Sequence, residues 1–148
     1  SLMMVSVVST GQAGSSFSFS ALVTAVTSNF GKIYVQTDIL LGDSESLPFP
    51  DNFFDVVYCN DSFHHYPAPR NVLSEVQRVL KPGGTFLMGD CWQPYIGRVI
   101  INFYMRHSKE GDVKIYSETE MVSMLSEYFH DVSWERIGNT ACISMGKK

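Results

Sequence analysis

Cysteine is scarce in this sequence, which argues against two common ways of holding a small protein together. The 148 residues include three cysteines, Cys59, Cys91 and Cys142, which are widely spaced and form no Cys-x-x-Cys pair. A disulfide framework needs paired cysteines, and a structural zinc site needs ligands at short, regular spacings. Each cysteine lies in or beside an apolar segment, so we expect buried thiols, a reducing cytoplasmic environment and no metal.

Long apolar runs and an excess of positive charge are also missing. No apolar run is long enough to span a bilayer, and no basic residue precedes Lys32, so we expect neither a membrane span nor a secretory signal. The net charge of -4 argues against a protein that binds the nucleic-acid backbone. The motif Gly-x-Gly-x-x-Gly is absent, which disfavours a nicotinamide-dependent oxidoreductase.

Residues 53–90 carry the clearest structural pattern, in a composition (45% hydrophobic, 18% charged) that suits one globular domain over residues 1–148. "FFDVVYCN" (53–60) predicts a buried strand, and apolar residues at helical spacing predict a helix over 69–80. "KPGG" (81–84) ends that helix, and "TFLMGD" (85–90) leaves as another strand. A strand, a helix and a strand in this order predict a parallel βαβ unit.

The flanking segments give weaker patterns. Ser117 and Glu120 form a capping box that opens a helix. Gly138 and Asn139 predict a tight hairpin between two strands. The remaining expectations are a strand at 3–8, a small-residue loop at 9–16, a helix at 17–30, a strand at 32–40, a helix at 95–107, and the hairpin strands at 132–137 and 141–146.

Three motifs in this order resemble the class I S-adenosylmethionine-dependent methyltransferases: "GDSESLPFPDNFFD" (42–55), "FHH" (63–65) and "LSEVQRVLKPGG" (73–84). The sequence is most similar to the small-molecule subgroup that includes the ubiquinone- and menaquinone-type enzymes. The resemblance implies an α/β fold: a Rossmann-like, mostly parallel sheet with a C-terminal antiparallel strand pair and helices on both faces. It also implies S-adenosyl-L-methionine as the cofactor and a small-molecule methyl acceptor.

The resemblance also implies cofactor-binding positions. An acid that ends the second strand of the family grips the ribose hydroxyls, and Asp38 matches it. The acid of the "GD" pair contacts the adenine amino group, which here is Asp43, and the backbone N–H of Ser44 meets an adenine nitrogen. Asn60 and Asp61, at the end of the predicted strand, line the cofactor crevice.

Two adjacent histidines follow that strand, and we predict His64 and His65 as the catalytic candidates. Histidine titrates near neutral pH and suits a general base. The alternative is that one of them packs against, or caps, the next helix. A metal site with Asp61 is disfavoured, because adjacent side chains diverge and no third ligand has suitable spacing.

Two departures from the family pattern concern the first half of the chain. In "VVSTGQAGSS" only Gly11 matches the cofactor's glycine loop, and Ser9 stands where the family has an acid. Only four residues separate Asp38 from Asp43, where the family has a helix and a strand, so roughly 20 residues are missing. The assignments of Asp38 and Asp43 therefore stay open, and a shortened sheet should expose an edge for a homodimer.

Two functions remain open from the sequence. The first is methyl transfer from S-adenosylmethionine to a small molecule by in-line displacement, in which alignment and exclusion of water supply most of the rate. The second is a methyltransferase-like binding or assembly module that no longer catalyses. Residues 95–107 are either a segment that covers an apolar substrate or a helix of the core.

Overall fold

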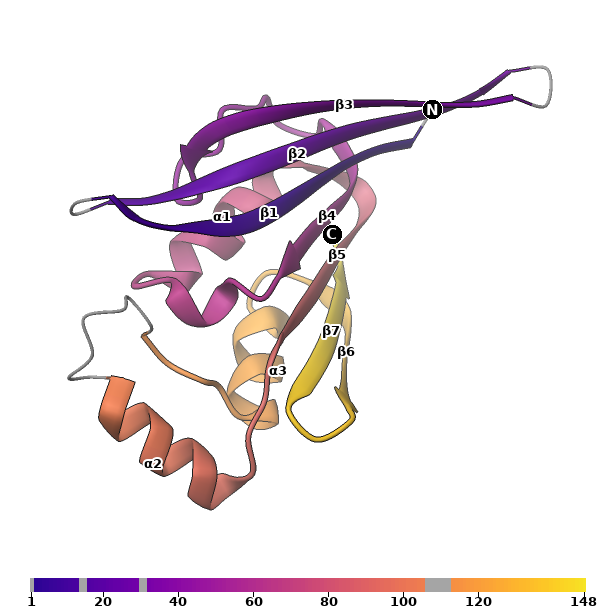
Figure 1. Cartoon of the computed structure of the whole chain (residues 1–148). Coiled ribbons are helices and arrows are strands. Elements are labelled where there is room, and N and C mark those ends of the chain that lie inside the picture. The colour runs from indigo at the N-terminus through magenta and orange to yellow at the C-terminus, as the bar shows by residue number, and fades with distance from the viewer. Residues whose placement is uncertain (1, 14–15, 30–31, 106–112) are drawn as a thin grey trace.

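The computed structural model describes residues 2–13, 16–29, 32–105 and 113–148. For the residues up to 41, this description covers the backbone and the strand pairing alone. The strands of this part form one sheet in the order β3-β2-β1-β4-β5-β7-β6 (Figure 1). The elements are β1 (Leu2–Ala13), β2 (Ser16–Asn29), β3 (Lys32–Asp43), β4 (Phe54–Asn60), the 3-10 helix η1 (Phe63–His65), α1 (Pro69–Val79), β5 (Leu80–Cys91), α2 (Tyr95–Met105), α3 (Glu118–Ser126), β6 (His130–Ile137) and β7 (Ala141–Lys147).

The predicted βαβ unit is confirmed as β4-α1-β5. Strands β4 and β5 pair in parallel, and α1 buries its apolar face against them. The helix begins at Pro69 and ends at Val79, and β5 starts at the next residue. Gly83 has a φ of 76°, and a Cβ on Gly84 would lie 2.9 Å from the carbonyl oxygen of Lys81. Both glycines are therefore required in the first residues of β5, where the strand leaves the end of α1.

The C-terminal elements also follow the sequence pattern. The Ser117 side chain accepts a hydrogen bond from the backbone N–H of Glu120, whose carboxylate accepts one from the N–H of Ser117. This capping box satisfies two otherwise unpaired donors at the start of α3. Strands β6 and β7 form the predicted antiparallel hairpin, with Gly138 at a φ of 62° in the turn.

The first half of the chain corrects two predictions. The helix expected at 17–30 is strand β2, and the loop expected at 9–16 belongs to β1 as far as Ala13. Strand β2 pairs antiparallel with both β1 and β3. Valine and threonine in this segment are stiff at χ1 and favour extended backbone. Because the chain has too few residues here for helical crossovers, its neighbouring strands are joined directly and run antiparallel.

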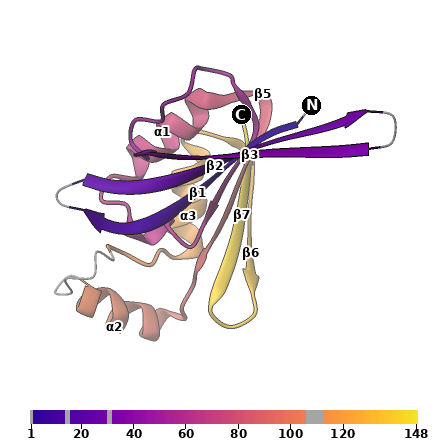
Figure 2. The same cartoon turned by 45° about the horizontal axis from the view of Figure 1, so that its top comes forward.

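The sheet is consequently mixed rather than mostly parallel. Among the described strands, β1–β4 and β4–β5 are parallel, and the other four neighbouring pairs are antiparallel. The helices are not on both faces either, since Figure 2 shows α1, α2 and α3 on the same side of the sheet. Phe86 and Met88 are buried on this side, whereas Ile143 on the opposite face is 38% exposed. A sheet face is covered by helices when parallel strands are joined by helical crossovers on that side. Strands β1, β2 and β3 are joined as hairpins, so no helix lies between them in the chain.

Arg78 ties the connection between β3 and β4 to α1. Its guanidinium donates to the carbonyl oxygens of Leu47 (3.0 Å) and Phe49 (2.8 Å), and to the carboxylate of Glu75 (2.8 Å). Leu47 is buried in the core that α1 and the sheet share. One planar fork with several donors can hold two carbonyls and a carboxylate together, and a lysine ammonium cannot match that geometry.

We expect Arg78→Lys to lower the free energy of unfolding by about 2 kcal/mol, because part-buried acceptors lose their donors. Chemical denaturation measures this change. The control is Arg70→Lys, which weakens the pair with Glu127 on a side chain that is 60% exposed. Solvent screens this exposed pair, so the control should change the free energy of unfolding far less than Arg78→Lys does. Equal losses in the two variants would contradict the anchoring role of Arg78.

Candidate functional site

A cleft of about 580 Å³ opens at the carboxyl ends of β4 and β5, beside the turn between β6 and β7. Its lining includes Asn60 and Asp61 from the end of β4, and Gly89, Asp90 and Cys91 from the end of β5. In open α/β sheets, ligands bind outside the carboxyl ends of the strands. The volume is within the range of small-molecule sites. This cleft is therefore the candidate functional site.

The floor of the cleft depends on close contact between the two strand ends. Asp61, at a φ of 49°, donates its backbone N–H to the carbonyl oxygen of Gly89 at 2.8 Å. The Tyr58 hydroxyl donates to Asn60 Oδ1 at 2.9 Å. A Cβ on Gly89 would lie 2.9 Å from that same Asn60 oxygen. Glycine at this position therefore leaves room for the Asn60 side chain on the floor.

Beneath the floor, His64 and Asp90 form a buried pair. His64 Nδ1 lies 2.6 Å from Asp90 Oδ1, and the backbone N–H of His64 donates to Asp90 Oδ2 at 3.0 Å. The backbone N–H of Cys91 donates to Asp90 Oδ1 at 2.7 Å. The His64 side chain is 11% exposed and that of Asp90 is 4% exposed. Helix η1 makes this pair possible because it turns His64 back toward the end of β5.

The pair changes what His64 can do. Burial alone lowers the pKa of His64, but the hydrogen bond and charge of Asp90, with a contribution from Cys91, outweigh it and raise the pKa to about 10. An imidazole with this pKa keeps its proton at neutral pH and does not act there as a free base. The ring of His65 lies 4.0 Å from that of His64, centroid to centroid, and is half-buried.

His64, Asp90 and Cys91 also form a group of three metal-ligand types, with the ligand atoms within 4.8 Å of one another. The Asp90 oxygens already accept three hydrogen bonds, from His64 Nδ1 and from two backbone N–H groups. Those bonds satisfy the carboxylate without an ion. We therefore interpret the group as an ion pair with a neighbouring thiol.

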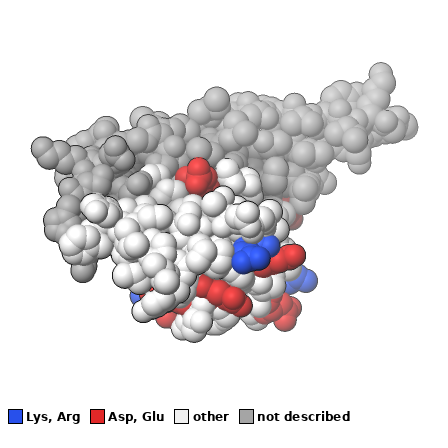
Figure 3. Space-filling model, turned by 60° about the horizontal axis from the view of Figure 1, so that its bottom comes forward, with Lys and Arg blue, Asp and Glu red and all other residues white. Residues whose placement is uncertain are grey.

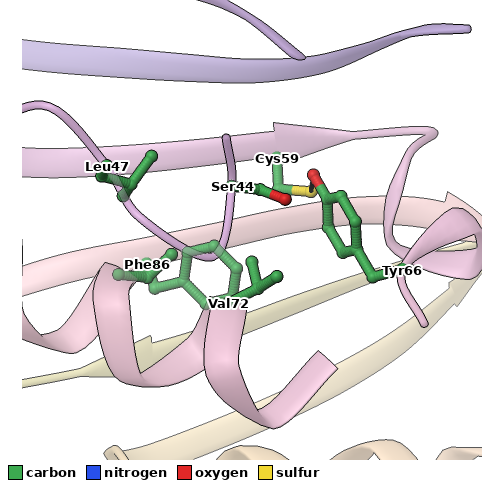
Figure 4. A pocket seen from close by; sticks show the side chains of 7 residues that line it. Ser44, Leu47, Cys59, Tyr66, Val72 and Phe86 are labelled. Carbon is green, nitrogen blue, oxygen red and sulfur yellow. Dashed lines mark hydrogen bonds between the residues drawn. The ribbon is translucent and has the colours of Figure 1, made fainter. Parts of the chain in front are cut away.

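Asp43 and Ser44 lie apart from the cleft lining. The exposed Asp43 accepts the N–H of Glu45 on Oδ1 at 2.9 Å. Ser44 is buried on the helix-covered side, and Figure 4 shows its hydroxyl near Cys59 and Tyr66. These residues line an enclosed space of about 10 Å³, which is about the size of one water molecule. The structure therefore does not bring Ser44 together with Asn60 and Asp61.

Two of the three cysteine thiols are buried, as the sequence analysis predicts. Cys59 and Cys142 are buried, and burial raises the pKa of the Cys59 thiol to about 12. Cys59 therefore stays a neutral thiol, 3.1 Å from Ser62 Oγ. Cys91 is half-buried and lines the cleft, so the prediction of three buried thiols is wrong for this residue.

The two remaining predicted positions lie in the N-terminal strands. Gly11 falls in β1 where the pairing with β2 shifts register, and no helix follows β1. The strand register relates Asp38 to β4 through two neighbouring strands. Asp38 pairs with Val23 in β2, Val23 pairs with Val5 in β1, and Val5 pairs with Val57 in β4. Asp38 is thus level with the middle of β4, about 14 Å away at three strand spacings. The structure does not bring Asp38 to the strand ends, and both assignments stay predictions.

The residues that the sequence analysis missed are Gly89, Asp90 and Cys91. The signal for them was present, because "GD" ends the apolar run of a strand parallel to β4. Carboxyl ends of neighbouring parallel strands share one edge, so the reasoning that selected Asn60 and Asp61 applies equally to Asp90.

A mixed sheet with a polar cleft at the carboxyl ends of its parallel strands defines a Rossmann-like α/β ligand-binding domain. Residues 14–88 match the family model described as a methyltransferase domain, and the chain belongs to this family. The resemblance to the S-adenosylmethionine-dependent methyltransferases is therefore confirmed at the level of the family, and S-adenosyl-L-methionine is the cofactor of such proteins. Within the part of the chain that the structure describes, no helix has the length and hydrophobicity to cross a membrane.

Solved structures of low sequence identity share the fold. The YcgJ protein from Bacillus subtilis has a TM-score of 0.60 at 23% identity, over 72% of this chain and 69% of that chain. A SAM-dependent methyltransferase from Methanosarcina mazei has a TM-score of 0.57 at 21% identity, over 72% and 65%. These likenesses confirm the Rossmann-like α/β class.

Similar sequences match over a shorter segment. The fatty-acid O-methyltransferase of Mycolicibacterium smegmatis is 47% identical over 58 residues, 39% of this chain and 21% of that protein. A phthiotriol/phenolphthiotriol dimycocerosates methyltransferase of Mycobacterium tuberculosis is 51% identical over 53 residues, 36% of this chain and 20% of that protein. The matched segments span about a fifth of the length of these relatives.

The cleft fits the cofactor in part. Asn60, Asp61 and the neighbouring strand ends offer hydrogen-bond acceptors and donors in a space large enough for a nucleoside. Ribose hydroxyls and an amino group are ligands of that kind. The amino-acid end of the cofactor has no helix N-terminus after β1 to receive its carboxylate, because β1 leads into β2.

Proposed function

We propose that this chain transfers the methyl group of S-adenosyl-L-methionine to a small-molecule acceptor. The observation that supports this proposal is the cleft at the ends of β4 and β5. The chain also belongs to the methyltransferase domain family. The names of the fatty-acid and phthiotriol relatives favour an apolar acceptor. We place the activity in the reducing cytoplasm, which the free thiols of Cys59 and Cys142 support.

In this proposal the residues of the cleft bind and align, and little acid–base chemistry is needed. The bound cofactor supplies an electrophilic methyl carbon on a sulfonium, whose sulfur leaves with the electron pair of the broken bond. Asn60 and Asp61 hold polar groups of the cofactor at the strand ends, and Asp43 is the candidate for the adenine amino group. Such positioning can supply most of the rate of an in-line displacement.

The two histidines have different roles in the proposal. His64 is a positioning residue, because Asp90 holds its imidazolium. The same carboxylate accepts the backbone N–H groups of His64 in η1 and of Cys91 at the end of β5, so it joins the two elements. His65 is the candidate base where the acceptor's nucleophile starts protonated. Its ring lies against that of His64, which restricts its orientation.

A second candidate function is a methyltransferase-like module that binds or assembles without catalysis. The observation that favours it is the antiparallel ladder of β1, β2 and β3, which stands where the glycine loop and its helix were expected. Strand β3 is at one edge of the sheet, and edge strands can pair with another chain. A homodimer through that edge belongs to this second candidate.

Titration with S-adenosylmethionine and S-adenosylhomocysteine separates the two functions. We expect micromolar binding by calorimetry, and Asp61→Asn should weaken it at least tenfold because one anionic acceptor of the floor is removed. Asn tolerates the positive φ of Asp61, so the backbone is kept. The matched control is Asp131→Asn, the same change at a φ of 51° on β6, outside the cleft lining.

The outcomes of this titration are opposed. Affinity that falls with Asp61→Asn and is kept by Asp131→Asn supports the enzyme. Asp38→Ala and Asp43→Ala, titrated in the same way, then identify which acid contacts the nucleoside. No heat at millimolar cofactor, from a chain shown to be folded by circular dichroism, favours the second candidate.

A further inference from the structure

Helix α2 (Tyr95–Met105) has its apolar face turned away from the protein. At about 100° per residue, its side chains divide into two halves of the helix circumference. The half against the protein holds the half-buried Gly97, Arg98, Ile101, Asn102 and Met105. The outer half holds only large apolar or aromatic side chains that are 51–73% exposed: Tyr95, Ile96, Val99, Ile100, Phe103 and Tyr104. The core-helix prediction for this segment is therefore wrong.

Specific polar contacts hold α2 in this orientation. Asn102 Nδ2 donates to the carbonyl oxygen of Ile115 at 2.9 Å, and the N–H of Ile115 donates to Asn102 Oδ1 at 2.8 Å. Arg98 donates to the carbonyl oxygen of Gln93 at 3.2 Å. The adjoining N–H of Lys114 donates to the carbonyl oxygen of His64 at 3.1 Å, which links the segment to the cleft. The outward apolar face is thus fixed by hydrogen bonds.

Few charges belong to α2 or to the described residues beside it. Arg98 is the one charged residue of the helix, and the neighbouring Lys114 pairs with Glu120. Figure 3 shows a broad uncharged area on the side where α2 lies, with charged side chains gathered beside it.

An apolar helix face with aromatic residues at its ends is typical of helices that lie in a lipid interface. Tyr95 and Tyr104 stand near the two ends of the outer half, and tyrosine suits the headgroup level. A second copy of the chain fits less well. One 16 Å helix offers a footprint of roughly 300 Å², against the 800 Å² or so per partner of a stable interface.

We propose that α2 docks this protein on a lipid surface, with its outer half in the boundary between headgroups and acyl chains. The helix follows directly from the end of β5, so docking places the mouth of the cleft near the lipid. The inference stands on α2 alone and holds whether or not the chain transfers methyl groups. Vesicle binding and cofactor titration are separate readouts, so either proposal can fail without the other.

Flotation of the purified chain with phosphatidylcholine vesicles containing phosphatidylglycerol tests this proposal. We expect the chain to float, and Ile100→Glu to reduce the bound fraction at least tenfold, with Ile96→Glu/Ile100→Glu abolishing it. The charge-matched control is Ser133→Glu on β6, an exposed position outside both α2 and the cleft lining. That control should bind within about twofold of the unchanged chain, because it adds the same charge outside α2.

Three results would overturn the lipid assignment. The first is a folded chain that does not float, and the second is an equal loss for Ile100→Glu and Ser133→Glu. The third is a dimer in vesicle-free sedimentation that Ile100→Glu dissociates, without flotation, since a second copy would then cover α2. Exposed positions are chosen throughout so that the variants keep the fold, which circular dichroism checks.

Discussion

Asp90→Asn is expected to lower the pKa of His64 from about 10 to its ordinary value of about 6.5 or below. The asparagine amide keeps the shape of the side chain but removes the charge that outweighs the burial of the imidazole. Nuclear magnetic resonance titration of the ring protons of the four histidines measures the change directly. A wild-type His64 that titrates near 6.5 would refute the buried ion pair.

The same substitution should make stability depend differently on pH. The pKa of His64 is raised in the folded chain, so its contribution is fully present below pH 6.5 and is lost as the pH rises through 10. At pH 6 we expect Asp90→Asn to cost about 3 kcal/mol, the lower end for breaking a buried pair, because His64 can release its proton. Above about pH 10 the two proteins should approach each other in stability.

Asp131→Asn provides the matched control for this experiment. Asp131 Oδ2 lies 3.2 Å from His130 Nδ1, and both side chains are mostly exposed, at 70% and 62%. Breaking an exposed pair of this kind should change the free energy of unfolding by less than about 1 kcal/mol. A loss as large as that of Asp90→Asn would show that the experiment reports a general charge effect and not the buried pair.

The parts of the fold that the sequence predicted correctly are those with local, mutually consistent signals. The β4-α1-β5 unit has helical periodicity, a proline at the first turn of α1 and glycines at Gly83 and Gly84. The capping box of Ser117 and Glu120 is equally local. Residues 17–30 instead form an apolar, β-branched run in which helix and strand cannot be separated by periodicity. Strand pairing with β1 and β3, a long-range interaction, decides that segment.

For the candidate site, the sequence predicted only those residues whose position follows from a single strand. Asn60 and Asp61 follow from the end of one strand. The pair of His64 and Asp90 joins residues 26 positions apart, and it depends on the parallel register and on the turn of η1. The orientation of α2 was equally hidden, because its apolar pattern is the same whether that face points inward or outward. Asn102 and its bonds to Ile115 fix the direction.

Phe54→Ala is expected to lower the free energy of unfolding by about 3–5 kcal/mol, which is the cost of emptying a large buried site. Phe54 is 0% exposed at the start of β4, with the rings of Phe49 and Phe53 edge-on at 4.9 Å and 5.0 Å. A loss of this size should reduce the melting temperature by roughly 10–15 °C in a chain of this length. Thermal unfolding followed by circular dichroism measures it.

The neighbouring Phe53→Ala is the control, and it tests the register on which the site depends. Phe53 is half-buried, so its loss should cost less than about 2 kcal/mol. A slip of one residue in β4 would exchange the two faces of the strand, exposing Cys59 and burying Asn60. Equal losses at Phe53 and Phe54, together with rapid labelling of Cys59 by a thiol reagent in the folded chain, would therefore overturn the placement of Asn60 on the cleft floor.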